Sequence, residues 1–395
     1  MLLEIIIFLF LGIIFGTFTG LAPGIHINLV GAILISLSAS FFVSVNPIYL
    51  VVFIVAMAIT HSFVDFIPSI FLGAPEEGTE LSVLPGHELL KEGRGYEAIM
   101  LTNYGGISAI FIFILISIPL IFLVPKIYNL ISEFIPFILI AVSLFMIFSE
   151  SEKLSAFFVF AVCGILGLIV LNIENLSQPL LPLLSGLFGA SALILSVKTK
   201  NQIPKQIITF PETKIAKPLF GSLFSSLICG FLPGLGSGQA AVIGNIISKT
   251  DRRGFLVLLG ATNTLVMGFS FIAIYTIQKA RTGAAASIQE LIGQISPQIL
   301  ILIFIAVFIS GISSFYITKF LARFFSDKIE KINYSKLSLF TIIFLSVIVF
   351  IVSGFLGFFV FFASTLTGIF CISQNVKRTL MMSCLLLPTI FLYLL

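Results

Sequence analysis

Hydrophobic runs separated by short polar segments fill most of the chain. A run of about 20 apolar residues is long enough to cross the hydrocarbon core of a bilayer as a helix. The short alternating segments typical of a membrane barrel do not occur along the sequence. The pattern therefore predicts an all-α polytopic membrane protein, with full spans at about 47–73, 97–124, 130–149, 154–172, 180–197, 254–278, 294–318, 337–353, 356–372 and 379–395.

Two further segments, 1–45 and 216–248, each divide into two apolar arms around a Gly-x-x-Pro-Gly motif. The motifs are Gly20–Gly24 and Gly230–Gly234. An arm of about 16 residues makes ~24 Å of helix, whereas the hydrocarbon core is ~30 Å thick. Each pair of arms therefore fits either a re-entrant hairpin or two tilted crossings.

The two halves repeat one plan, a Pro-Gly helical hairpin followed by about five transmembrane helices. An odd number of crossings gives the halves opposite orientations, and Thr60–Val64 matches Thr262–Val266 locally. We expect two inverted-topology repeats, 1–197 and 216–395, joined by a basic cytoplasmic linker at 198–215 within one integral membrane domain. Inverted repeats with interrupted helices are the usual architecture of secondary transporters.

Basic residues give the orientation, because cytoplasmic loops carry an excess of Lys and Arg. Of the 21 Lys and Arg residues, only Lys126, Lys279 and Arg281 lie on the opposite side. This distribution predicts a multi-pass protein of the cell membrane with both termini outside. The basic loops are 74–97, 150–153, 198–217, 249–253, 319–336 and 377–378.

Composition excludes a water-soluble globule, since the 395 residues are 58% hydrophobic and 10% charged, with a mean hydropathy of +1.19. The net charge of +4 is small and lies in loops that flank the membrane, so no nucleic-acid partner is expected. The cysteines lack metal or redox spacing and are expected to be packing residues, with no metal site and no cofactor: Cys163, Cys229, Cys371 and Cys384.

The second Pro-Gly tip combines helix breakers with hydrogen-bonding side chains. Proline stops the incoming helix, and the glycines let the backbone turn and approach a ligand closely. The next arm would direct its free N–H groups into the tip, which suits a carboxylate or phosphate, while freed carbonyls could hold Na⁺. A tight turn for helix packing is the alternative, but irregular backbone at membrane depth needs a cavity or protein burial.

Both tips are therefore predicted to hold the substrate near the membrane midplane. The candidate substrate-binding residues are Pro23, Gly24, His26 and Asn28 in the first tip, Pro233, Gly234, Gly236, Ser237, Gly238 and Gln239 in the second, and Asn263 in the matched segment.

Asp65 is the only carboxylate well inside a full span, and His61 precedes it by one helical turn. Residues at i and i+4 share a helix face. Ionisable residues within the membrane are often proton relays or ion ligands, so this pair is the candidate for coupling to H⁺ or Na⁺. The structural alternative is a neutralised pair that fixes a kink at Pro68.

Two polar loops carry further candidates. Pro75, Glu76 and Thr79 belong to the first, which is rich in charges and helix breakers. Lys279 and Arg281 belong to the second, where they would attract an anion. Anchoring at the membrane surface explains these two basic residues equally well.

An ordered set of motifs resembles the large membrane subunit of the tripartite tricarboxylate transporters. The set comprises the two Gly-x-x-Pro-Gly tips, Leu72–Pro75, the stretch Leu84–Gly95, and Pro233–Gly238 followed by Asn263. Membership would imply a permease that takes up a small organic anion, a carboxylate, by symport with H⁺ or Na⁺. It would also imply a small membrane subunit and an extracytoplasmic binding protein as partners.

Two other classes of function remain open. Paired Pro-Gly loops also resemble those of polyprenyl-phosphate translocases, although the Leu72–Gly95 motifs favour the carboxylate family. An intramembrane enzyme would have to use His61, Asp65 and Ser237, and no metalloprotease or serine-hydrolase motif supports it. Transport without enzymatic activity is therefore the expected function.

Overall fold

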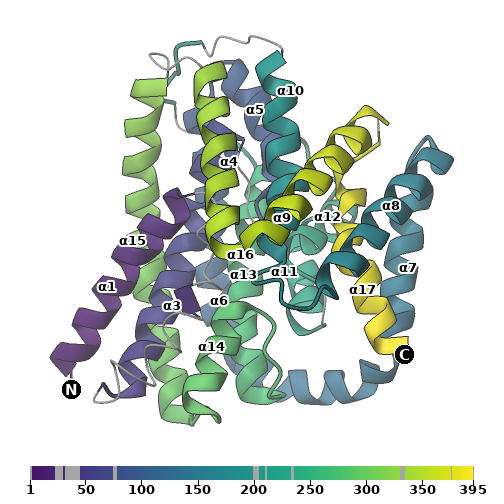
Figure 1. Ribbon diagram of the computed structural model, residues 1–395. Helices are drawn as coiled ribbons and strands as arrows, with labels where there is room; N and C mark the ends of the chain where they lie inside the picture. Colours follow the sequence, from purple (N-terminus) through teal and green to yellow (C-terminus); the bar gives the residue numbers. More distant parts are fainter. Residues whose placement is uncertain are drawn as a thin grey trace.

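The computed structural model describes residues 2–22, 30–31, 45–73, 78–198, 204–209, 211–232, 235–329, 334–374 and 376–394. Every regular element in these ranges is a helix, and Figure 1 shows the helices packed side by side. Seven helical stretches are long and apolar enough to cross a membrane, as expected for a polytopic membrane protein. They are α1 (Leu2–Leu21), α3 (Pro47–Val64) with α4 (Phe66–Leu72), α6 (Gly95–Ile131), α8 (Lys153–Leu171), α13 (Arg252–Thr276), α15 (Pro297–Ile329) and α16 (Tyr334–Ser373).

Several predicted spans are occupied by shorter helices. The region 130–149 contains α7 (Ile135–Phe148), whose 14 residues are ~21 Å long and so fall short of the bilayer core. The region 180–197 contains a helix interrupted by a π-helical turn, and 379–395 begins with a 3₁₀ turn. These and the remaining helices are α5 (Val83–Lys91), α9 (Leu180–Leu184), α10 (Ser191–Lys198), α11 (Ala216–Phe231), α12 (Ser237–Ser248), α14 (Gly283–Ile292) and α17 (Ser383–Leu394).

The predicted spans 337–353 and 356–372 both lie in α16, which is broken at Gly354. This glycine has φ 66° and ψ −166°, a conformation that is costly for residues with a Cβ. Figure 1 shows the two limbs of α16 meeting at an angle. The limbs correspond to the two predicted spans.

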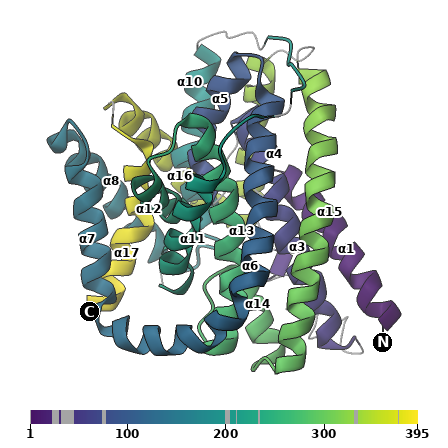
Figure 2. The same cartoon turned by 180° about the vertical axis from the view of Figure 1, so that it is seen from behind.

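Helix α6 is longer than the predicted span 97–124 and changes direction near its end. It contains Pro119 and Pro125, which remove backbone donors and bend a helix. Figure 2 shows the last part of this blue helix running sideways along the lower edge of the molecule. The apolar pattern alone does not distinguish this lateral extension from a loop.

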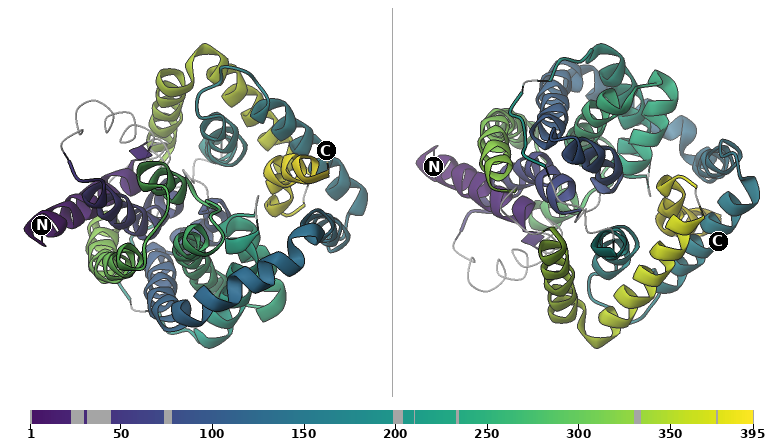
Figure 3. Two further views of the ribbon diagram at one scale, coloured as in Figure 1. Left: turned by 90° about the horizontal axis from the view of Figure 1, so that it is seen from below. Right: turned by 90° about the horizontal axis from the view of Figure 1, so that it is seen from above.

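Helices α3 and α13 form the buried centre of the bundle. The first packs against α1 and α15, and the second packs against α11 and α6. A Cβ at Gly105 would collide with the carbonyl of Val257, and one at Gly260 would collide with the carbonyl of Thr102. The backbones of α6 and α13 are therefore in direct contact, while Figure 3 shows α1 and α8 at opposite edges.

Loops that share the predicted basic side lie together at one end. The Ile207 N–H donates to the Gly93 carbonyl at 2.7 Å, and Arg252 pairs with Glu92 at 2.8 Å. Three of these loops are thereby joined. Figure 1 shows the C-terminal end of α10 at the upper end of the molecule and both chain termini at the lower end.

Candidate functional site

A break between α3 and α4 positions the only carboxylate in this stretch. Helix α3 runs from Pro47 to Val64 and is capped by Asn46, whose side chain accepts from the Ile48 N–H at 3.0 Å. Pro68 lacks an N–H and would clash with the carbonyl four residues earlier, which belongs to Val64. The break therefore falls at Asp65, which is 2% exposed.

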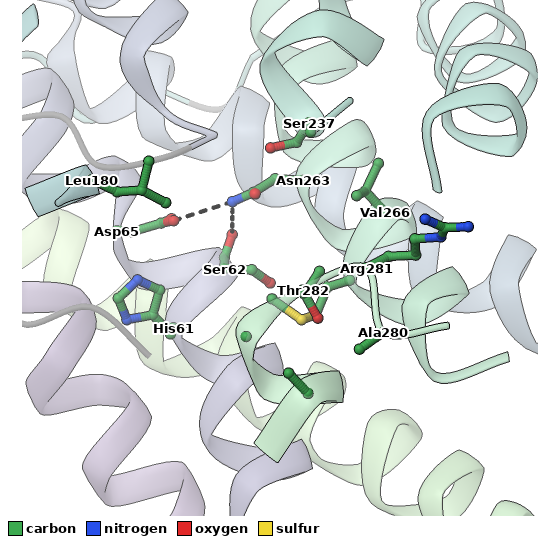
Figure 4. A pocket seen from close by; sticks show the side chains of 14 residues that line it. His61, Ser62, Asp65, Leu180, Ser237, Asn263, Val266, Ala280, Arg281 and Thr282 are labelled. Atoms are coloured by element: carbon green, nitrogen blue, oxygen red, sulfur yellow. Dashed lines mark hydrogen bonds between the residues drawn. The ribbon is translucent and has the colours of Figure 1, made fainter. Parts of the chain in front are cut away.

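His61 lies one turn before the break and is also buried. Its Nδ1 lies 3.0 Å from the Thr19 hydroxyl on α1, so the ring is oriented by a neighbouring helix. Figure 4 shows the His61 and Asp65 side chains on the same wall of a cavity. The predicted i, i+4 pair is thus placed on one face, as its spacing requires.

Asn263 connects α13 to this wall. Its Nδ2 donates to Asp65 Oδ2 at 3.1 Å and to the Ser62 carbonyl at 3.2 Å. Figure 4 draws both bonds, which join residues about 200 positions apart in the sequence. Asn263 thereby brings the matched segments of the two halves together.

The N-terminal end of α12 forms a second wall. Gly236 and Ser237 line the cavity there, and the Gly236 N–H donates to Gln239 Oε1 at 2.9 Å. Gln239 therefore caps the helix. Gly236 has φ −101° and ψ −170°, which any residue adopts, so its backbone conformation does not itself require glycine.

The N-terminal end of α14 forms the third wall. Thr282 caps it by accepting from the Ala285 N–H at 3.3 Å, and Ser270 Oγ lies 2.9 Å from the same hydroxyl. Arg281 precedes this cap, and its guanidinium carbon lies 5.6 Å from the centre of the Tyr128 ring. Among the described residues, its buried Nε and Nη2 have no hydrogen-bond acceptor.

These walls enclose a cavity of about 340 Å³. Two helix N-termini and Arg281 contribute positive potential on one side, and an anion is stabilised by such groups. Asp65 and His61 place two ionisable side chains on the other side. The arrangement can therefore accommodate a small anion beside side chains of the kind that serve as proton relays or ion ligands in membrane proteins.

The structure brings many of the sequence candidates together but not all of them. Thr79 lies behind Asp65, with its hydroxyl 2.6 Å from Ser69 Oγ, which in turn donates to the Asp65 carbonyl at 2.8 Å. Gln239 and Gly238 are buried in the first turn of α12, and Lys279 is exposed. The candidates that line the cavity are His61, Asp65, Gly236, Ser237, Asn263 and Arg281.

Eight candidates lie outside the described residues. They are Pro23, Gly24, His26, Asn28, Pro75, Glu76, Pro233 and Gly234.

Several lining residues have no place among the sequence candidates. Two of them could have been found from the sequence. Ser62 lies in the matched segment Thr60–Val64, and Thr282 before Gly283 is of the residue type that caps helices. The apolar lining residues carry no such signal. They are Leu180, Val266, Met267, Ala280 and Ala286.

Comparisons with known proteins agree with the motif pattern. The sequence profile of the tripartite tricarboxylate transporter TctA family matches residues 6–383. An uncharacterized protein of Methanocaldococcus jannaschii is 34% identical over 354 residues, which cover 87% of this chain and 88% of that protein. No solved structure matches. With a profile match across nearly its whole length, this multi-pass membrane protein belongs to the tripartite tricarboxylate transporter TctA family.

Proposed function

We propose that this chain is the permease of a secondary transporter that carries a small organic anion, a carboxylate, by symport with H⁺ or Na⁺. The observation that carries the proposal is the convergence of α12, α14 and Arg281 on the cavity that also contains Asp65. The family match favours a carboxylate over a polyprenyl-phosphate carrier or an enzymatic substrate.

The anion would bind against the helix N-termini. Both α12 and α14 begin at the cavity, with Ser237 as the first residue of α12 and Thr282 as the cap of α14. Backbone N–H groups at a helix N-terminus bind carboxylate oxygens without needing a particular side chain. Arg281 adds a full positive charge and buried donor atoms that have no acceptor among the described residues.

Two inverted repeats, 1–197 and 216–395 with the linker 198–215, provide the proposed route for alternating access. Helix α3 contacts α1 and α15, and the matched helix α13 contacts α11 and α6. These contacts are equivalent if the halves are related by inversion. Helices α11 and α12 pack on each other and are 16 and 12 residues long. Each is too short to cross a ~30 Å core, which favours a re-entrant Pro-Gly hairpin.

Coupling would operate through Asp65 and His61. Asp65 lies at the helix break and bonds to Asn263, so a change in its charge would alter a contact between the two halves. A proton or a sodium ion could make that change. The family also implies a small membrane subunit and an extracytoplasmic binding protein, and the basic end would face the cytoplasm.

Uptake of radiolabelled citrate into liposomes, under an imposed pH or sodium gradient, tests the proposal. Arg281→Gln should raise the half-saturating citrate concentration about tenfold or more, since it removes a charged hydrogen-bonding group. Lys279→Gln is the matched control, because Lys279 is basic and two residues away but exposed. Wild-type protein that takes up no citrate or other carboxylate under either gradient would contradict the proposed function.

A further inference from the structure

A second, basic cavity lies at the start of α11 and shares no lining residue with the candidate substrate site. Its volume is about 710 Å³, and it opens at the end of the molecule that carries the basic loops. Lys214, Lys217 and Lys249 line it and are exposed. Within the described part of the chain, none of these three ammonium groups forms an ion pair.

The acidic residues of this cavity do not neutralise it. Asp251 Oδ1 accepts from the Gly254 N–H at 2.9 Å and so caps α13. Glu212 is the other carboxylate in the lining, and Arg253 is held by Glu97 at 3.0 Å. With Arg253 paired, three lysines face two carboxylates, and the lining has an excess of one positive charge.

Below the cavity, α11 presents an apolar stripe outward. Phe220, Phe224 and Ile228 are 56%, 45% and 41% exposed, and they follow Lys217 on one helix face at intervals of three to four residues. The Phe220 and Phe224 rings lie 4.6 Å apart. Figure 2 shows α11 and α12 on the face of the molecule nearest the viewer.

We propose that this cavity and stripe bind an anionic phospholipid. Its phosphate would occupy the cavity among Lys214, Lys217 and Lys249, and its acyl chains would lie along Phe220 and Phe224. Basic pockets at the cytoplasmic ends of membrane helices recognise such head groups. A water-soluble anion would use the same lysines but would gain nothing from the apolar stripe.

Native mass spectrometry of the detergent-solubilised full chain tests this assignment with dioleoylphosphatidylglycerol and dioleoylphosphatidylcholine as probes. The wild type should bind the anionic lipid in preference to the neutral one. The triple variant K214Q/K217Q/K249Q should bind the anionic lipid about a hundredfold more weakly, at roughly fivefold for each lysine. The matched control is K153Q/K205Q/K328Q, which removes three exposed lysines of the same end outside the cavity.

Three outcomes would overturn the proposal. One is equal weakening in both triple variants, which would indicate general surface electrostatics. Another is displacement of the lipid by excess glycerol phosphate, which would indicate a site for a soluble anion. The third is unchanged lipid binding by Phe220→Ser, compared with the control Phe340→Ser on the exposed face of α16.

Discussion

The side-chain amide of Asn263 donates a hydrogen bond of 3.1 Å to the carboxylate of Asp65. The two residues come from the central helix α13 and from the break after the central helix α3. Both are buried, and the same amide holds the Ser62 carbonyl at 3.2 Å. This contact joins α3 and α13 at the cavity. A change in the charge of Asp65 would therefore change the strength of a bond between the two central helices.

Asp65→Asn should abolish uptake driven by a pH gradient while leaving substrate binding detectable. The new amide oxygen can still accept from Asn263, so the variant removes the charge and preserves the geometry. Citrate counterflow and pH-driven uptake in liposomes would separate binding from coupling. Ser62→Ala is the control for loss of a neutral polar group in the same lining, since among the described residues the Ser62 hydroxyl bonds to the Ile59 carbonyl of its own helix at 2.9 Å. Unchanged proton-driven uptake in Asp65→Asn would assign the His61–Asp65 pair a structural role. If uptake by the wild type depends on sodium instead, the backbone carbonyls of the Pro-Gly tips become the candidate ion ligands.

Asn263→Leu should destabilise the protein by about 1–3 kcal/mol, because two buried acceptors, Asp65 Oδ2 and the Ser62 carbonyl, lose the Asn263 amide at nearly constant side-chain volume. The midpoint of thermal unfolding in detergent measures this effect. Thr264→Val provides the comparison, since the Thr264 hydroxyl bonds to the Gly260 carbonyl of its own helix at 3.1 Å. Equal midpoints for the two variants would show that the link between Asn263 and Asp65 adds no stability.

Gly236→Val should reduce citrate binding more than Ser237→Ala. Valine would add bulk where the α12 N-terminus lines the cavity, whereas the serine change removes at most one hydrogen bond, ~0.5–1.5 kcal/mol, or about 1.5–3 kcal/mol to a charged partner. Gly24→Val in the first tip should act in the same way if both tips face one cavity. Equilibrium binding is measured on variants that elute as folded protein in size-exclusion chromatography. If both glycine variants bind and transport like the wild type, the tips are only turns. The substrate site would then be sought in the segment 75–95, which contains α5.

A cysteine introduced at Asn175 should react with a membrane-impermeant thiol reagent added outside intact cells, and one at Lys205 should not. Both positions are exposed, so the contrast reports sidedness rather than burial. The four native cysteines are all buried and give a low background. Opening the cells should make the Lys205 position reactive. The reverse labelling pattern would contradict both the orientation and the inverted repeat.

The sequence by itself determined the membrane class and the positions of the main helices. Apolar runs must become helices in lipid, since every backbone N–H and C=O needs a partner within its own segment. Local rules also placed His61 and Asp65 on one face, and Pro68 explains the break beside them. These properties depend on residues a few positions apart, so the pattern contains them.

The tertiary structure alone decided which distant residues meet. The bond between Asn263 and Asp65 depends on how α3 and α13 pack, and no local rule predicts that packing. The sequence predicted that Gln239 contacts the substrate, and only the fold showed that its oxygen also caps α12. The start of α14 lines the cavity because of where α13 ends within the bundle. The position of that end also places Arg281 against Tyr128 of α6. Side-chain contacts of this kind follow from helix positions in three dimensions, which hydrophobic periodicity does not encode.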